Sequence, residues 1–241
     1  MKIVILLVLM AMLSGCDNDT DNPVTKLELA FELKFDGELL SGANQMYELD
    51  DSVKMRFSKV SFYLSDFKLT EGTQSFPLLD VLHISFLQNI NGDAVQEMIQ
   101  VLGFEIPSGN YSSLSFGLGL TPAQNGTVPA DHSEGALSLT GEYWPAWESY
   151  IYEKIEGSYQ VGDGEQKSVA LHVGGNETYR LLEWKNGLSI SNNEVKRITI
   201  PIDLKRILED YPMTESPVLH KLEQLPLMEM IADGFAESMN N

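Results

Sequence analysis

Apolar and polar residues alternate along much of this chain, and this period-two pattern constrains the fold more than any other feature. In residues 26–35, KLELAFELKF, every second side chain is leucine or phenylalanine. Alternation of this kind indicates a β-strand with one buried face. Residues 195–204 alternate in the same way and predict a second such strand. The chain is therefore expected to be built mainly from strands.

Other strands are predicted with local irregularities. Residues 52–69 alternate in three pieces, and the phase changes after Phe57 and after Leu64, which predicts a β-bulge or bend at each place. Residues 77–86 form an apolar run typical of a further strand. Gly117 and Gly119 hold alternate positions of the strand expected at 111–120, where a missing side chain permits close approach by another residue. One short helix is expected within residues 91–106.

The C-terminal residues change to a helical period. Apolar side chains recur on one face of an expected amphipathic helix at Met228, Ile231, Ala232, Phe235 and Met239. The chain has no internal repeats and no second zone of composition. We therefore expect one all-β domain over residues 25–241: an antiparallel, Greek-key-like β-sandwich of about eight or more strands with a few peripheral helices.

The N-terminus has the pattern of a bacterial lipoprotein signal. Residues 1–15 contain Lys2 and an apolar run too short to span a bilayer, and they end in Leu-Ser-Gly before Cys16. The sequence predicts cleavage before Cys16, lipidation of that residue, and a membrane anchor followed by an acidic tether at 16–24. An ordinary secretory signal with an incidental cysteine is the alternative. The lipoprotein interpretation predicts a lipid-anchored location in the bacterial cell envelope, at the periplasmic face or the outer membrane.

Charge and cysteine content exclude several classes of function. The formal net charge is −19, so neutralisation of nucleic-acid phosphates is not an available binding mode. Cys16 is the only cysteine, which excludes a disulfide scaffold and a thiolate metal cluster within the fold.

The four histidines are the candidate metal ligands, although no two have the i, i+2 or i, i+4 spacing of a local metal motif. His172 lies at the end of an expected strand, before Gly174-Gly175, where its ring can face an open cleft. His132 lies on the long irregular connection 121–141, a length that often indicates function. His83 is expected in the core. His220 is interpreted as a surface residue, with a ligand role as the alternative.

No catalytic apparatus is evident. The chain lacks a Gly-x-Ser-x-Gly element and a phosphate-binding loop. Residues 141–157 are rich in tryptophan and tyrosine and also contain four carboxylates: Glu142, Glu148, Glu153 and Glu156. A pair of carboxylates is the apparatus of glycoside hydrolysis. Acidic residues are so common in this chain, however, that pairs of them arise by chance. We therefore expect the protein not to be an enzyme.

Several segments together resemble one family. LELAFELKFDGELL, KMRFSKVSFYLSDFKL, IPSGNYSSLSFGLGL, GALSLTGEYWPAWESYIYEKIEG and LHVGG follow one another in the order seen in the MbnP-like proteins. These are periplasmic or outer-membrane β-sandwich proteins related to the copper proteins of methanotrophs. The matching segments extend through most of the chain that follows Cys16.

The resemblance implies copper bound by histidine imidazoles, in some members beside a tryptophan oxidised to kynurenine by a di-haem cytochrome c peroxidase-like partner. His172 matches the family histidine before Gly-Gly. Trp144 matches the first tryptophan, after Tyr143, and Tyr150 matches the strand tyrosine. The family's second tryptophan falls on Ala146, so Trp147 is displaced by one position. His132 is the first histidine after the place, Asn125-Gly126, where many members have one.

Copper suits histidine ligands without thiolates better than calcium or magnesium does. The sequence thus predicts metal ligation by His172 and His132, with Trp144 as the modifiable neighbour. A metal-free module, which uses the aromatic cluster to bind a small ligand or a protein partner, is the alternative.

Overall fold

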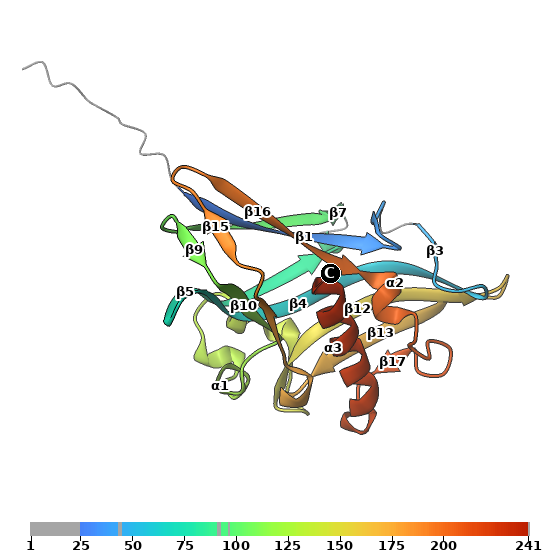
Figure 1. Ribbon diagram of the computed structural model, residues 1–241. Coiled ribbons are helices and arrows are strands. Elements are labelled where there is room, and N and C mark those ends of the chain that lie inside the picture. Colours follow the sequence, from blue (N-terminus) through green and yellow to red (C-terminus); the bar gives the residue numbers. More distant parts are fainter. Residues whose placement is uncertain (1–24, 43–44, 91–92, 96, 241) are drawn as a thin grey trace, which may run out of the picture.

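The computed structural model describes residues 25–42, 45–90, 93–95 and 97–240. They form two curved sheets that face each other, with the C-terminal helix α3 (Leu225–Met239) across the larger one (Figure 1). The predicted signal peptide 1–15, the lipidation site Cys16 and the tether 16–24 lie outside the described residues. The prediction of an all-β sandwich with few helices is confirmed.

The smaller sheet is built around β1 (Lys26–Phe35). Its neighbours are β16 (Val195–Asp203), β2 (Glu38–Leu39) and β8 (Ile99–Glu105). Strands β1 and β16 are parallel, with Leu29 opposite Ile198. The sandwich therefore contains parallel as well as antiparallel pairs.

The larger sheet has the order β14-β10-β4-β12-β13-β17, and β3, β5 and β11 pair at its margins. The bounds of the first six are β14 (Arg180–Trp184), β10 (Ser113–Leu118), β4 (Val53–Glu71), β12 (Ser149–Val161), β13 (Lys167–Gly174) and β17 (Val218–Leu219). The three marginal strands are β3 (Tyr47–Glu48), β5 (Gln74–Phe86) and β11 (Tyr143–Trp144). Two small ribbons join β15 (Leu188–Ile190) to β9 (Gly109–Tyr111) and β6 (Gln88–Ile90) to β7 (Asp93–Val95). The remaining helices are α1 (Pro122–Asn125), α2 (Leu204–Leu208) and the 3-10 turns η1 (Pro129–Asp131), η2 (Ala136–Ser138), η3 (Thr140–Glu142), η4 (Asn176–Thr178) and η5 (Leu222–Gln224).

Strand β4 contains both irregularities that its sequence predicts. In its pairing with β12, Lys59 lies opposite Glu156 and Phe57 lies opposite Gly157. Ser58 is therefore an extra residue in β4. Its register with β10 shifts between Ser65 and Lys68, where Asp66 has a φ of 58°. The two changes of phase in the alternation are thus confirmed as bulges, which bend this long strand.

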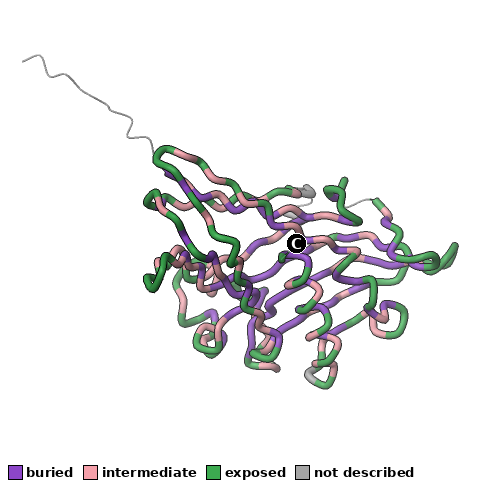
Figure 2. The backbone as a smooth tube through the Cα atoms, in the orientation of Figure 1, coloured by how far each residue is buried: buried purple, intermediate pink, exposed green. Residues whose placement is uncertain are grey.

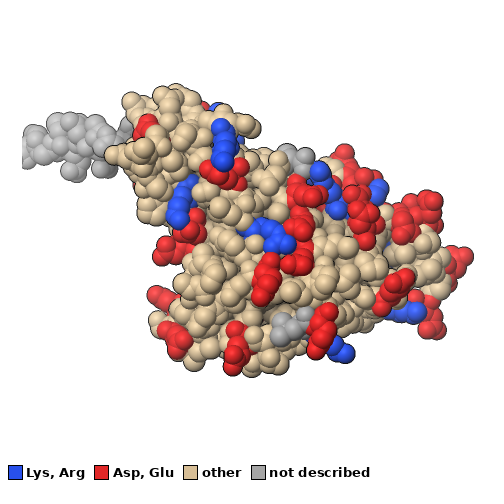
Figure 3. Space-filling model, turned by 60° about the horizontal axis from the view of Figure 1, so that its bottom comes forward, with Lys and Arg blue, Asp and Glu red and all other residues tan. Residues whose placement is uncertain are grey.

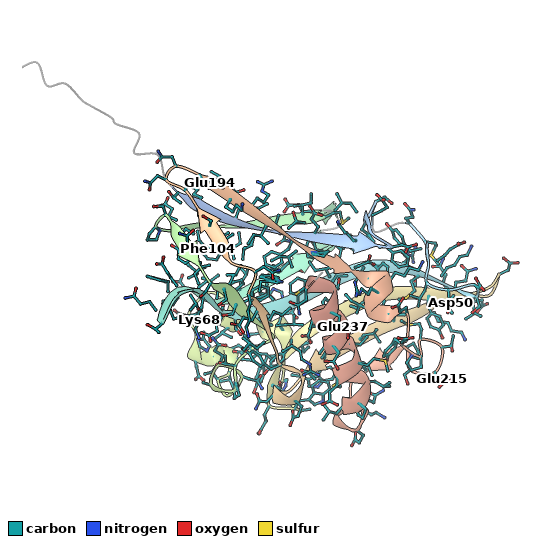
Figure 4. The ribbon with its side chains drawn as sticks, viewed as in Figure 1. Asp50, Lys68, Phe104, Glu194, Glu215 and Glu237 are labelled. Atoms are coloured by element: carbon teal, nitrogen blue, oxygen red, sulfur yellow. The ribbon has the colours of Figure 1, made fainter. Side chains whose placement is uncertain are left out.

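The core lies between the two sheets. Phe31 of β1 packs edge-on against Phe62 and Phe116, with ring centroids 6.5 and 6.4 Å apart. Phe104 of β8 similarly lies 6.0 Å from Phe67 of β4. Figure 2 shows the buried residues concentrated in the interior, and Figure 4 labels Phe104 on the smaller sheet. Burial of these aromatic faces is what the alternation of the strands provides.

The close approach expected at Gly117 of β10 and at Gly119, which directly follows that strand, is confirmed. A Cβ atom added at Gly117 would lie 2.4 Å from the Tyr179 ring, and one at Gly119 would lie 2.4 Å from the Tyr152 ring. Gly119 also has a φ of 88°, which favours glycine. Close approach of these tyrosines covers the outer face of the larger sheet.

The prediction of a helix within residues 91–106 is wrong. The described residues there form β7 and β8, and β8 pairs antiparallel with β1 from Ile99 to Glu105. Along β8, Leu102 and Phe104 are half-buried, whereas Ile99 and Val101 are exposed. Pairing with a distant strand outweighs the local helical tendency of this segment, because propensity is a weak prior.

Helix α3 has the predicted amphipathic form. Met228, Ile231, Ala232, Phe235 and Met239 are all buried. Phe235 packs on Phe62 of the larger sheet with ring centroids 5.7 Å apart. Among the described residues, no helix has the length and apolar character needed to cross a membrane.

Candidate metal-binding site

A parallel strand pair brings two histidines together. Strand β17 pairs with β13, with Ala170 opposite Val218 and Leu171 opposite Leu219. Parallel strands in register place equivalent residues side by side. The next residues along the two chains are His172 and His220, and their rings are stacked with centroids 4.7 Å apart and planes 26° apart.

A short hairpin supplies two tryptophans. Strand β11 pairs with the start of β12, with Trp144 opposite Ser149. The turn between them has Pro145 at its second position, which proline favours, and the Trp147 backbone N–H donates to the Trp144 carbonyl oxygen at 3.0 Å. Trp144 and Trp147 therefore stack face to face, with centroids 4.6 Å apart and planes 4° apart.

Trp144 contacts both histidines. Its ring centroid lies 4.8 Å from that of His220 and 5.9 Å from that of His172, each at an interplanar angle of 68°. Three sequence segments, near residues 144, 172 and 220, thus meet on the outer face of the larger sheet. Trp147 joins the cluster through its stack on Trp144, although its position departs from the family pattern.

Glu156 of β12 fixes the orientation of His172. Its Oε1 atom lies 2.8 Å from the Nε2 atom of His172. Hydrogen bonding to His172 is the main factor that lowers the pKa of Glu156, with burial acting in the opposite direction and the charges of His172, Lys154 and Lys59 adding to the lowering. An ionised carboxylate only accepts, so Nε2 of His172 is the protonated nitrogen. The Nδ1 atom is then the nitrogen with a free lone pair whenever the ring is neutral.

Two imidazole nitrogens at this site are buried and lack a hydrogen-bond partner among the described residues: Nδ1 of His172 and Nε2 of His220. Burial lowers the pKa of His220, and the charge of His172 lowers it further, against the opposing effect of Glu156. His220 therefore remains neutral at physiological pH, the state in which imidazole binds metals. Buried polar atoms without partners are costly, so both nitrogens are available for a ligand.

The donor set fits a soft or borderline transition metal better than calcium or magnesium, since it offers imidazole nitrogens. Within the described residues, no three histidine, cysteine, aspartate or glutamate side chains are grouped so that they could hold a metal ion. The site is therefore a two-histidine site with an aromatic wall.

The structure brings together a different pair of histidines from the pair that the sequence predicts as ligands. His220, interpreted as a surface residue, is half-buried between Trp144 and His172. His132 follows η1, where its Nε2 lies 2.8 Å from Thr127 Oγ1, and no described contact joins it to His172. His83 is half-buried and packs on Tyr63 at 4.7 Å, and burial lowers its pKa to about 4.

The sequence contains no signal that selects His220. Three of the four histidines follow a leucine, so the matching Leu-His pairs at 171–172 and 219–220 do not stand out. Parallel pairing of β13 with β17 makes them neighbours, and that pairing is a tertiary feature. Tyr150 and Tyr152 of the neighbouring strand β12 are fully buried. Tyr143 packs edge-on against Tyr150 at 5.1 Å.

The protein surface is acidic, in agreement with the formal net charge of −19. Figure 3 shows aspartate and glutamate side chains spread over the face turned forward, with fewer lysines and arginines between them. Such a surface attracts cations through long-range electrostatics.

The fold and this site define a class: a β-sandwich protein with paired histidines and paired tryptophans on the outer face of its larger sheet. A family model described as MbnP matches residues 24–221. The chain belongs to the MbnP family. The solved structure of MbnP from Methylosinus trichosporium is similar, with a TM-score of 0.49 and 13% identity over 78% of each chain. A comparison with curated proteins finds no match.

Proposed function

We propose that this MbnP-family protein binds copper, with Nδ1 of His172 and Nε2 of His220 as ligands. The observation that carries the proposal is a pair of buried imidazole nitrogens without partners among the described residues, on two rings that stack on each other beside Trp144. Copper would supply Lewis-acid and redox character at this position. Glu156 holds the tautomer of His172 that leaves Nδ1 free, and the indole of Trp144 keeps water away from the site.

Removal of either histidine is expected to weaken copper binding. In the His172→Ala and His220→Ala variants, affinity for Cu(I) should fall by about 100-fold or more, since outer-shell changes alone cost about 10- to 100-fold. Affinity is measured by competition with a chromophoric chelator, and Cu(II) is titrated in parallel. The matched control is His132→Ala, whose ring lies away from the pair and whose affinity should stay close to that of the parent.

Two results would contradict the copper proposal. One is the absence of tight Cu(I) or Cu(II) binding by the parent. The other is a His220→Ala variant that keeps the affinity of the parent while the His132→Ala variant loses it, which would favour ligation by His132.

The alternative function is a metal-free binding module. The observation in its favour is that no group of three potential ligand side chains occurs in the described part of the chain. The stacked tryptophans would then bind a small ligand or a partner surface through their aromatic faces. A parent protein that binds no copper in the titration above would support this function.

We further propose that the protein acts in metal handling rather than as an enzyme, attached to the cell envelope through a lipidated Cys16. A di-haem peroxidase-like partner would oxidise Trp144, which contacts both histidines.

Intact-mass analysis of protein from its native host tests both the lipidation of Cys16 and the oxidation of Trp144. An unmodified N-terminus would contradict the anchor, and an unmodified Trp144 in the presence of such a partner would contradict the oxidation.

A further inference from the structure

A buried ion triad lies next to the tryptophan hairpin. Glu142 is placed between two lysines, with Lys59 Nζ 2.7 Å from its Oε1 atom and Lys154 Nζ 2.6 Å from its Oε2 atom. The side chains of Glu142 and Lys154 are only 8% and 6% exposed. Lys154 also donates to the Gly141 carbonyl oxygen at 3.1 Å. The triad thus ties residues 141–142 to strands β4 and β12 of the larger sheet.

This anchor is adjacent in sequence to the residue that covers the histidines. Glu142 ends η3, and β11 begins with the next two residues, Tyr143 and Trp144. Only two residue pairs join β11 to β12. The hairpin that carries the stacked tryptophans is therefore short of backbone hydrogen bonds, and a charged anchor at its base has a large share in fixing its position.

Breaking the triad is costly because Glu142 and Lys154 are buried, whereas Lys59 is half-buried. Burial raises the pKa of Glu142, but hydrogen bonding to and the charges of Lys154 and Lys59 lower it below the usual value, so the carboxylate is ionised. Removal of one member of such a group leaves another charge buried without its partner. The hairpin cannot lift from the sheet without the same cost.

The same lysines also face the histidine site. Across the sheet, Lys154 pairs with His172 and Lys59 pairs with Glu156. Their charges contribute to the lowered pKa of Glu156, whose carboxylate orients His172. The triad and the histidine pair thus share one face of the sheet.

We propose that Glu142 is a positioning residue: through Lys59 and Lys154 it holds the β11–β12 hairpin so that Trp144 lies against His172 and His220. The effect on metal affinity rests on the proposed function. The placement of the tryptophans does not, because it is a property of the fold with or without a metal.

The test compares Glu142→Gln with Glu148→Gln in the full chain. Both remove one carboxylate from the same region, but Glu148 is exposed at the turn. In Glu142→Gln, the exciton couplet of the two stacked indoles in circular dichroism should be lost or strongly reduced, and Cu(I) affinity should fall about tenfold or more. Glu148→Gln should retain both. Glu142→Asp, which restores the charge, should recover part of the couplet.

Loss of folding in Glu142→Gln would not end the test, because Lys59→Met keeps the Glu142–Lys154 pair and should weaken the couplet while the protein stays folded. A folded Glu142→Gln variant with the parent's couplet would overturn the proposal. If the parent binds no copper, the proposed function fails, while the couplet still decides whether Glu142 positions the tryptophans.

Discussion

Replacement of Glu153 by methionine is expected to stabilise the protein by about 1 kcal/mol or more at pH 7, because it removes a buried polar group without a partner. Glu153 of β12 is fully buried, and neither of its carboxylate oxygens has a hydrogen-bond partner among the described residues. It lies opposite Phe62 and next to Val173 in the sheet, on the face covered by α3. An isolated carboxylate in such surroundings is prohibitively costly, so the residue stays protonated. A methionine of similar volume removes that cost.

The pH dependence gives the sharper measurement. Burial raises the pKa of Glu153 well above its ordinary value, and the charge of Arg180 opposes this only in part. The folded state therefore retains a proton that the unfolded state releases above about pH 4.5, and stability should fall as pH rises, by about tenfold in the folding equilibrium per pH unit. Below the unfolded pKa this penalty vanishes.

Chemical denaturation of the parent and Glu153→Met at several pH values measures both effects. The difference in unfolding free energy should be small near pH 4 and grow toward pH 7. A difference that is the same at both ends of this range would show that Glu153 is not held protonated by the fold.

Among the glycine-to-alanine replacements at described positions, Gly157→Ala is expected to destabilise the protein most. A Cβ atom at this position would lie 1.9 Å from the Arg56 carbonyl oxygen. Gly157 sits at the register shift between β12 and β4, so the neighbouring atoms are backbone and cannot rotate away. We expect a loss of about 3 kcal/mol or more in the free energy of unfolding.

Gly103→Ala is the matched control. Gly103 is also in a strand, β8, but a Cβ atom there would meet nothing within 4 Å. Its replacement should leave stability unchanged or raise it by about 0.5 kcal/mol, because alanine restricts the unfolded chain. Equal denaturation midpoints for the two alanine variants would contradict the role assigned to close backbone contact at Gly157.

Much of the fold follows from local pattern. The strands β1, β4 and β16 are evident from alternation, and both bulges of β4 follow from changes in its phase. Alternation works because a strand at the core must bury every second side chain. The prediction of a helix in the region of β8 was wrong, because this segment pairs as a strand with β1.

The candidate site was predictable only in part. His172 and Trp144 could be selected because each matches a family segment. His220 and Glu156 could not, since one depends on the parallel pairing of β17 with β13 and the other on a cross-strand hydrogen bond. The burial of Glu153 without a hydrogen-bond partner among the described residues could not be predicted either, because nothing in the sequence distinguishes it from the many other acidic residues.

The sequence by itself determined the strand-rich class of this protein, its bulges, its amphipathic C-terminal helix and its family, because these depend on the order of side chains along the chain. Only the tertiary structure decided which histidines meet, which carboxylate is buried between two lysines and which is buried alone. Those outcomes depend on the register between strands distant in sequence, and the free energy of that register is shared by the whole core rather than encoded in any one segment.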